Sequence, residues 1–278
     1  MIGPRMARRL RTLLIYALLS VTSAVVLLPV AWVWMTAFKS NKEIRESALA
    51  LPKVIRFQNY VGAWTGAHFD RYFANSVIVG ICTVAIVLAV GSLAAYAFAR
   101  MRFRGNRLIF ALIFLGMTFP QTARLGPLLT LMYKLHLVNT RWALMLAYSA
   151  GSLPFSILMM RSFFRGFPEE LEQAARIDGC SSLQFFVRVL LPLSMPALTT
   201  LGIFAFMAAW NEFLEALLLI SRDGLRTLPL GLMVFQGEYY TDYALSIAGI
   251  NITAFPVILV YIVFQRRFIE GLTAGSLK

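Results

Sequence analysis

Long runs without a charged residue are the feature that most constrains how this chain folds. Five of them are long enough to cross the hydrocarbon core of a bilayer, for which a helix needs about 20 apolar residues. They are Thr12–Phe38, Tyr72–Ala99, Trp142–Met160, Val189–Asn211 and Tyr243–Gln265. A sixth run begins at Leu108 and is interrupted by Arg124. Because backbone groups in lipid must be satisfied within the segment, the runs predict an all-α polytopic membrane protein.

The composition supports the same class. Hydrophobic residues make up 59% of the chain and charged residues 14%, whereas soluble domains carry about 25% charged residues. The net charge is +13, but the basic residues flank apolar runs and are not interleaved with aromatic residues. We therefore expect a lipid membrane as the surroundings and no nucleic acid. The two histidines and two cysteines lack metal-ligand spacing, so we expect no metal site and no cofactor on this chain.

We predict six transmembrane helices with both termini in the cytoplasm. The predicted spans are residues 13–36, 72–98, 107–126, 142–160, 198–219 and 246–265. The first run follows four arginines as in a signal peptide, but it exceeds an h-region of about 7–15 residues, so a transmembrane helix fits better. The short loop from Arg100 to Arg107 holds four arginines and no acid, which places it inside. Pro120 and Pro127 predict a kink or stop near the end of the third helix, with 125–137 as an interfacial segment.

A polar segment at 169–196, predicted to be cytoplasmic, has helical order. Pro168 suits a first helical position, acids follow in the first turn, and Gly179 suits the stop. The expected apolar face of this helix is Leu171, Ala174 and Ala175. Ser181 and Gln184 predict the capping box of a second helix. Its expected apolar face is Leu183, Phe186, Val187 and Leu190.

This helix pair has two interpretations. It lies on lipid headgroups, or it docks on a cytoplasmic protein. Glu169, Glu170 and Glu172 make the first helix acidic, whereas helices that bind anionic lipid are rich in Lys and Arg. The charge therefore favours a protein partner.

The segment resembles the EAA loop of ATP-binding-cassette (ABC) importer permeases, in particular the carbohydrate-uptake, maltose-permease-like branch. The matching residues are Gln173, Ala174, Ala175, Arg176, Ile177, Asp178 and Gly179, followed by Val189, Leu190, Leu191 and Pro192. Further matches are Asn75 and Ser76, Trp210 to Phe213 (W-N-[DE]-F), Thr227 to Leu232 (T-L-P-x-G-L), Gln265 to Phe268 (Q-R-x-F) and Gly271 to Gly275 (G-L-T-A-G). Together they cover roughly residues 71 to 278. Gln173 replaces the motif's glutamate, and Glu172 lies about 100° away around the helix, so position 173 lacks the carboxylate of the motif. Cys180 replaces the alanine that follows the motif's glycine.

The resemblance implies the type I ABC importer permease fold. The expected organisation is a tail, first helix and extracytoplasmic segment at 1–70, a core at 71–265 containing the loop, and a cytoplasmic tail at 266–278. The expected location is the bacterial or archaeal cell (inner) membrane. The implied function is the membrane-spanning subunit of an ATP-driven, binding-protein-dependent importer of a sugar or sugar-like solute, working by alternating access.

The resemblance also implies partners: a homologous second permease subunit, two ABC ATPase subunits and an extracytoplasmic solute-binding protein. The chain has no phosphate-binding loop of the G-x-x-x-x-G-K-[ST] type. We therefore expect a transport subunit and not an enzyme, with ATP and Mg on the partner subunits. The implied ATPase-coupling residues are Glu169, Glu172, Gln173, Ala174, Ala175, Asp178, Gly179, Leu191 and Pro192. Disaccharides, oligosaccharides, polyols and glycerophosphodiesters all remain open as solutes.

Polar residues within the predicted spans mark a candidate translocation pathway, because they usually face a cavity. The candidates are Trp210, Asn211, Glu212, Glu215 and Asn251. We expect the three between 211 and 215 on one side of a continuous fifth helix. The acids alternatively lie at the hydrated outer interface or hydrogen-bond across a subunit interface. Trp210 either stacks on a sugar ring or packs, and Asn251, like Thr253, alternatively serves helix packing.

An alternative function is a proton- or sodium-coupled secondary transporter, and a third is a structural subunit of a membrane complex. A secondary transporter needs buried, paired ionisable residues across several spans. The acids concentrate in one predicted span, and we expect no basic partner from a neighbouring span. Arg124 is expected to snorkel to the outer surface, with gating as the alternative.

Overall fold

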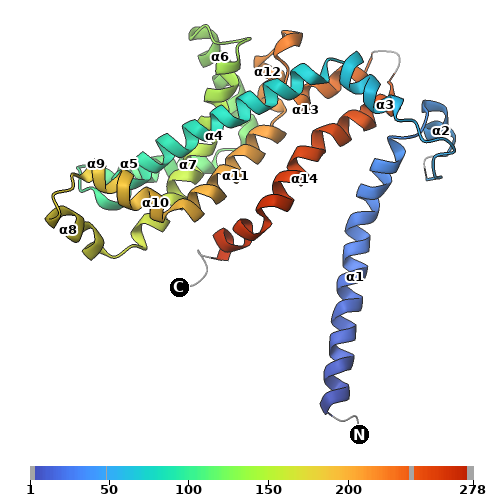
Figure 1. Cartoon of the computed structure of the whole chain (residues 1–278). Coiled ribbons are helices and arrows are strands. Elements are labelled where there is room, and N and C mark those ends of the chain that lie inside the picture. Colours follow the sequence, from blue (N-terminus) through green and yellow to red (C-terminus); the bar gives the residue numbers. More distant parts are fainter. Residues whose placement is uncertain (1–3, 48, 238–240, 274–278) are drawn as a thin grey trace. The chain divides into compact units, whose positions relative to one another are not determined.

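The computed structural model describes residues 4–47, 49–237 and 241–273 (Figure 1). The regular elements of these ranges are helices, apart from one isolated bridge between Gln236 and Thr241. Residues 274–278 of the predicted tail, including the end of the G-L-T-A-G match, lie outside the described residues.

Four helices are long and apolar enough to cross a membrane. They are α1 (Pro4–Thr36), α4 (Phe69–Arg100), α7 (Arg141–Arg165) and α14 (Tyr243–Thr273), with candidate spans at Arg11–Thr36, Phe69–Arg100, Arg141–Arg165 and Tyr243–Gln265. Two bent pairs bring the total to six if each pair is one span: Asn106–Thr118 with Gln121–Lys134 at 106°, and Ser182–Leu193 with Met195–Asn211 at 79°. The prediction of an all-α membrane protein is confirmed.

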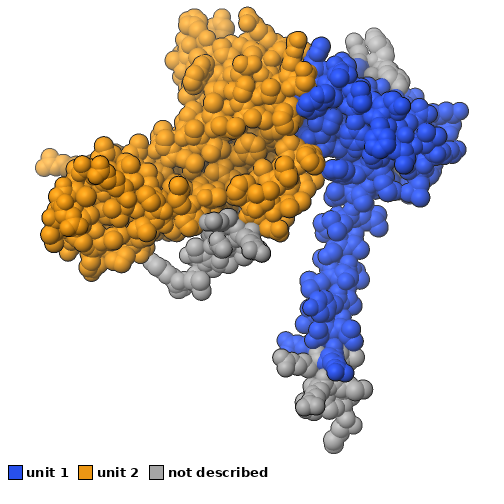
Figure 2. Space-filling model, viewed as in Figure 1, with its two compact units in different colours: residues 1–69, 232–254 blue, residues 70–231, 255–278 orange. Residues whose placement is uncertain are grey.

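Contacts divide the chain into two compact units, coloured separately in Figure 2. Unit 1 contains residues 1–69 and 232–254. Its elements are α1, α2 (Asn41–Glu46), α3 (Gln58–Val61), η1 (Gly62–Gly66), η6 (Leu232–Phe235) and the first part of α14. The amide of Asn59 donates to the carbonyls of Ala37 and Lys39, at 2.7 and 2.9 Å. The amide of Asn41 donates to Asp242 at 2.9 Å, which ties α2 to the start of α14.

Unit 2 contains residues 70–231 and 255–278. Between its long helices lie α5 (Asn106–Leu115), η2 (Gly116–Thr118), η3 (Gln121–Arg124), α6 (Leu125–Lys134), α8 (Glu169–Ile177), α9 (Ser182–Phe185), η4 (Phe186–Leu190), α10 (Leu191–Leu193), α11 (Met195–Asn211), α12 (Leu214–Leu219), η5 (Asp223–Leu225) and α13 (Leu228–Gly231). Two apolar clusters hold it together. One packs α7 against α6 and α12, and the other packs the ends of α4 and α7 against α8, α9 and η4.

The break of the third predicted span occurs where the prolines indicated. The helical run that starts with α5 ends at Thr118, and Pro120 takes an extended conformation with ψ 139°. Pro127 lies in the first turn of α6, where a missing N–H costs nothing.

The predicted continuous fifth span at 198–219 is wrong. Helix α11 ends at Asn211, Glu212 is extended with ψ 127°, and α12 starts at Leu214. The carboxylate of Glu212 accepts the backbone N–H groups of Glu215 and Ala216, at 2.9 and 3.2 Å. By accepting the free N–H groups at the start of α12, the Glu212 side chain stabilises a new helix start over the continuation of α11. The helix therefore breaks here.

Candidate functional site

The first cytoplasmic helix forms as predicted, with a shift of one residue at its start. Pro168 precedes α8 as its N-cap residue instead of lying within it. Arg176 pairs with Glu172 at 2.8 Å, one turn apart. Gly179 has φ +80° and the N–H of Cys180 donates to the carbonyl of Ala175 at 2.9 Å, so the left-handed stop is confirmed.

The faces of α8 differ in part from the prediction. Leu171 and Ala175 pack against the body of unit 2, as expected. Ala174 is exposed instead, so its place on the packed face was wrong. It shares an outward face with Gln173 and with Ile177, whose side chain is 87% exposed. Residues four apart lie on the same face of a helix, so Ala175 shares the packed face with Leu171 and Ala174 does not.

The second cytoplasmic helix begins with the predicted capping box. The Gln184 amide oxygen accepts the Ser181 N–H at 2.8 Å, and the Ser181 hydroxyl accepts the Gln184 N–H at 3.3 Å. The predicted apolar face is only half right. The buried residues are Phe185, Phe186 and Leu190, while Leu183 and Val187 are exposed. Residues 186–190 form a π-helical turn, in which positions five apart align, so Phe185 joins Leu190 on the inner face.

The other predicted coupling residues lie at the ends of α8 and in α10. Glu169 and Asp178 are exposed at the two ends of α8, and Pro192 is exposed in α10 beside the half-buried Leu191. The structure therefore gathers the nine residues on one continuous segment, α8 to α10. This segment ends in the sharp bend that leads into α11.

A second candidate site lies where the two broken helices meet. Arg124 at the end of η3 places Nη2 2.6 Å from Oε1 of Glu215 in α12. Gln121 of η3 donates to Glu212 at 3.1 Å. These contacts flank a cavity of about 480 Å³ that is also lined by Tyr148 of α7. The Glu215 side chain is 1% exposed and that of Arg124 is 42% exposed.

Two predictions about this region were wrong. The acids do not lie on one side of a continuous helix, because Glu212 lies in the break after α11 and Glu215 lies in α12. The expectation that no neighbouring span supplies a basic partner also fails, since Arg124 pairs with Glu215 instead of only snorkelling. Sequence reasoning missed Gly151 as well. A Cβ there would lie 2.9 Å from the Arg124 guanidinium, so the glycine leaves room for the arginine against α7.

The cavity gathers some of the candidate pathway residues and not others. Asn211, Glu212 and Glu215 line it. Trp210 does not, because it is 1% exposed and packs against Phe206 and Phe73, with ring centroids 5.4 and 5.8 Å away. This geometry agrees with the packing alternative for Trp210.

Asn251 is a packing residue in the described structure. It belongs to unit 1, is buried, and donates to the hydroxyl of Tyr60 at 2.9 Å. It is not among the residues that line the cavity.

A protein family and several known proteins match most of this chain. Residues 87–269 match the family described as "binding-protein-dependent transport system inner membrane component". The chain is 38% identical over 265 residues to the diacetylchitobiose uptake system permease protein NgcG of Streptomyces coelicolor, covering 95% of this chain and 88% of the relative. It is 36% identical over 256 residues to the trehalose/maltose transport system permease protein MalG of Thermococcus litoralis, covering 91% of each.

A solved structure agrees over nearly the whole chain. One chain of a bacterial ABC transporter involved in the import of the acidic polysaccharide alginate superposes with a TM-score of 0.82 at 25% identity. The superposition covers 94% of this chain and 98% of that one. By its sequence over most of its length and by its helical architecture, the chain belongs to the inner membrane components of binding-protein-dependent transport systems, the permeases of ABC transporters.

Proposed function

We propose that this chain is the membrane-spanning subunit of an ATP-driven importer of a sugar or oligosaccharide. The observation that carries the proposal is segment α8 to α10, with the left-handed Gly179 after α8, the capping box of α9 and the outward face of Gln173, Ala174 and Ile177. Relatives whose names include diacetylchitobiose, trehalose/maltose and arabinooligosaccharides support a carbohydrate solute.

The coupling step is a transfer of movement from α8 to the membrane helices. The inner face of α8 packs through Ala175 on the cluster that contains Phe164 of α7 and Phe185 of α9. Displacing α8 therefore displaces the ends of α4 and α7, because a close-packed interior transmits strain. Its outward face is free to bind a cleft on an ATPase subunit, which would hold the ATP and Mg. Gln173 would contribute an amide hydrogen bond there in place of a carboxylate contact.

The complete transporter in this proposal contains a second permease, two ATPase subunits and an extracytoplasmic solute-binding protein. A solved relative of the fold is a bacterial alginate transporter in complex with a periplasmic protein bound to an alginate pentasaccharide. The proposal retains the organisation predicted from the sequence, with a segment 1–70, a core 71–265 and a tail 266–278.

The cavity between the broken helices is the part of the pathway that belongs to this chain. Arg124, Asn211 and Glu212 offer it donors and acceptors, and one oxygen of Glu215 is buried without a hydrogen-bond partner in the described part of the chain. Sugar hydroxyl groups both donate and accept, so a passing solute suits this lining.

Substitution on the outward face of α8 tests the proposal. Ile177→Glu should leave the chain folded, because the side chain is exposed, and should abolish co-purification of the ATPase subunits and ATP-dependent uptake. Leu49→Glu is the matched control, since Leu49 is 84% exposed on the predicted opposite side of the membrane. Normal uptake by Ile177→Glu, or equal loss in both variants, would overturn the coupling role.

The ion pair between the partly exposed Arg124 and the buried Glu215 also suits an ion-coupled transporter. Uptake into vesicles that hold the complete complex separates the two functions. Import that requires ATP and continues after the ion gradients are dissipated supports the ABC importer, and import that follows the gradient without ATP supports the alternative.

A further inference from the structure

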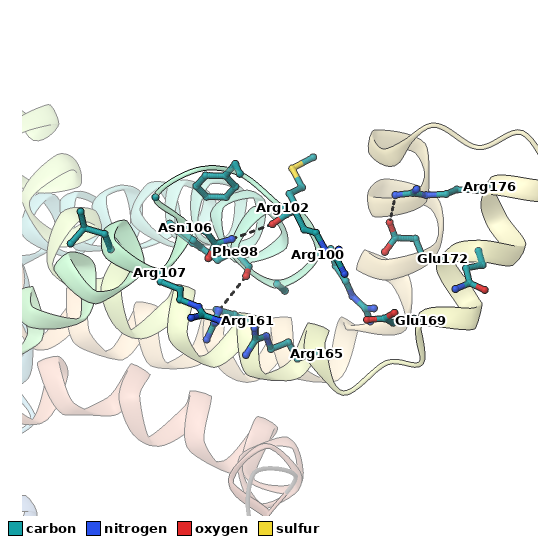
Figure 3. Close-up of a pocket in the computed structure, with 16 residues that line it drawn as sticks. Phe98, Arg100, Arg102, Asn106, Arg107, Arg161, Arg165, Glu169, Glu172 and Arg176 are labelled. Atoms are coloured by element: carbon teal, nitrogen blue, oxygen red, sulfur yellow. Dashed lines mark hydrogen bonds and ion pairs between the residues drawn. The ribbon is translucent and has the colours of Figure 1, made fainter.

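A cationic hollow of about 1070 Å³ lies beside α8, at the end of unit 2 that contains the second apolar cluster. The end of α4, the loop 101–105, the start of α5, the end of α7 and α8 enclose it (Figure 3). All five segments contribute its arginines: Arg100, Arg102, Arg107, Arg161, Arg165 and Arg176. The acids that line it are Glu169 and Glu172.

The positive charge of the hollow is not balanced from within. Glu172 is matched by Arg176 at 2.8 Å. Arg100 donates to the carbonyls of Phe164 and Phe167, at 2.7 and 2.6 Å. These hydrogen bonds fix the position of its guanidinium but do not neutralise its positive charge.

The remaining arginines are oriented into the hollow without being neutralised. Arg161 donates to a carbonyl at 3.3 Å and stacks on the ring of Phe110 at 4.0 Å. No salt bridge joins Arg102, Arg107 or Arg165 to a carboxylate within the ranges that the structure describes. Glu169 alone offsets part of this excess, so the hollow suits an anion.

An apolar stripe starts at the edge of the hollow. Helix α5 begins among the lining residues, and Leu108, Leu112 and Leu115 each expose more than half of their side chains. Residues at this spacing lie along one face of a helix. The anion that fits both features carries hydrocarbon chains as well as negative charge.

We propose that the hollow binds the phosphodiester headgroup of an anionic phospholipid, with its acyl chains along the exposed face of α5. The planar guanidinium fork matches phosphate oxygens in pairs. Basic pockets between transmembrane helices on the cytoplasmic side are suited to anionic headgroups. The lipid would join the ends of α4, α5 and α7 to α8, the helix that carries the outward face described above.

The convergence of arginines from several segments distinguishes this site from a loop whose positive charge only sets the orientation of the protein in the membrane. Positive charge in a cytoplasmic loop fixes topology wherever the charges point. Here the arginines of α7 line the same hollow as Arg100, Arg102 and Arg107, as Figure 3 shows for Arg107, Arg161 and Arg165.

Lipid retention by the purified full-length chain tests the proposal. The chain is delipidated in detergent and titrated with phosphatidylglycerol or phosphatidylcholine, and bound lipid is counted by native mass spectrometry. We expect preference for phosphatidylglycerol. Each surface Lys or Arg contributes about 1 kcal/mol of attraction to anionic lipid, so Arg102→Gln with Arg107→Gln should weaken binding about thirty-fold. Arg102→Lys with Arg107→Lys should retain most of it.

The matched control is Arg9→Gln with Arg11→Gln, which removes the same charge from exposed positions on α1 at the same predicted membrane face. It should weaken retention less than the Arg102→Gln and Arg107→Gln variant, with all variants showing equal helicity by circular dichroism. Equal losses in both double variants, or no preference over phosphatidylcholine, would overturn the proposal. Saturation by inorganic phosphate alone would assign the hollow to a free anion instead. If Arg102→Gln with Arg107→Gln loses ATPase association in the complete transporter but retains lipid normally, the hollow binds the partner protein and the lipid proposal is wrong.

Discussion

Arg124 and Glu215 form an ion pair whose two members differ in their access to water. Glu215 is almost completely buried in α12, whereas Arg124 remains partly exposed in η3. Removal of one partner leaves a buried charge unpaired, while removal of both leaves a neutral site. The two kinds of change therefore have different costs.

Arg124→Gln should lower the free energy of unfolding more than Arg124→Gln combined with Glu215→Gln. Breaking a fully buried pair costs about 3–5 kcal/mol, and because Arg124 keeps contact with solvent we expect about 2 kcal/mol here. Denaturation in detergent, followed by tryptophan fluorescence for both single variants and the double variant, measures the coupling. Strictly additive losses would show that the pair contributes nothing beyond its separate residues.

Gly231→Ala should destabilise unit 2, because a Cβ at this position would overlap the ring of Tyr72. The ring has little room to move, since the Tyr72 hydroxyl donates to Asp223 at 2.8 Å. Overpacking of this kind costs about 1–3 kcal/mol. Gly126→Ala in α6 is the control, with nothing within 4 Å of the added atom, and should raise helix stability by up to about 1 kcal/mol. Equal melting temperatures for both variants would contradict the steric argument.

At the scale of elements, the sequence determined most of what depends on neighbours along the chain. The capping box of Ser181 and Gln184, the stop at Gly179 and the break at Pro120 all depend on residues within a few positions. The end of α11 at Asn211 was missed because the apolar run predicts a continuous helix. The extended conformation of Glu212, which ends the helix, is visible only in the structure. The Arg124–Glu215 pair was missed because its members are 91 residues apart. The sequence offered one indication of this pair, which is that Arg124 and Glu215 each interrupt an apolar run.

Helix α2 carries a cap that depends on pH. The backbone N–H of Ser40 donates to the Glu43 carboxylate at 2.8 Å and lowers the pKa of Glu43 below its ordinary value. A carboxyl whose pKa is lowered by folding stabilises fully above the ordinary value of about 4.3, and its contribution is lost as the pH falls through the lowered value.

Amide exchange of residues 41–47 should therefore gain protection above pH 5 relative to pH 3, after correction for intrinsic exchange rates. Glu43→Gln, which keeps an acceptor but does not ionise, should show the same protection at both pH values. A pH-dependent difference of equal size in the variant would rule out Glu43 as the source.

At the scale of the whole molecule, the predicted orientation places the α8 segment and residues 38–71 on opposite faces of the membrane. In a background of Cys82→Ala and Cys180→Ala, and without the ATPase subunits, a membrane-impermeant maleimide should label Leu49→Cys in intact spheroplasts and Ile177→Cys in inverted vesicles. Both positions are highly exposed, so each should react fully once the membrane is dissolved. The reverse pattern would invert the topology and with it the coupling role of α8.

Helix α1 has a consequence for how this polypeptide tolerates change. Its side chains from Arg11 to Ala31 are exposed, so the apolar side chains of this stretch are not held by a packed core within unit 1. Swapping one aliphatic residue for another along this stretch should leave the fold of the isolated subunit untouched. Positions at which such substitutions reduce transport in a mutational scan would thus mark contact with a neighbouring polypeptide. Positions at which they have no effect would mark contact with lipid.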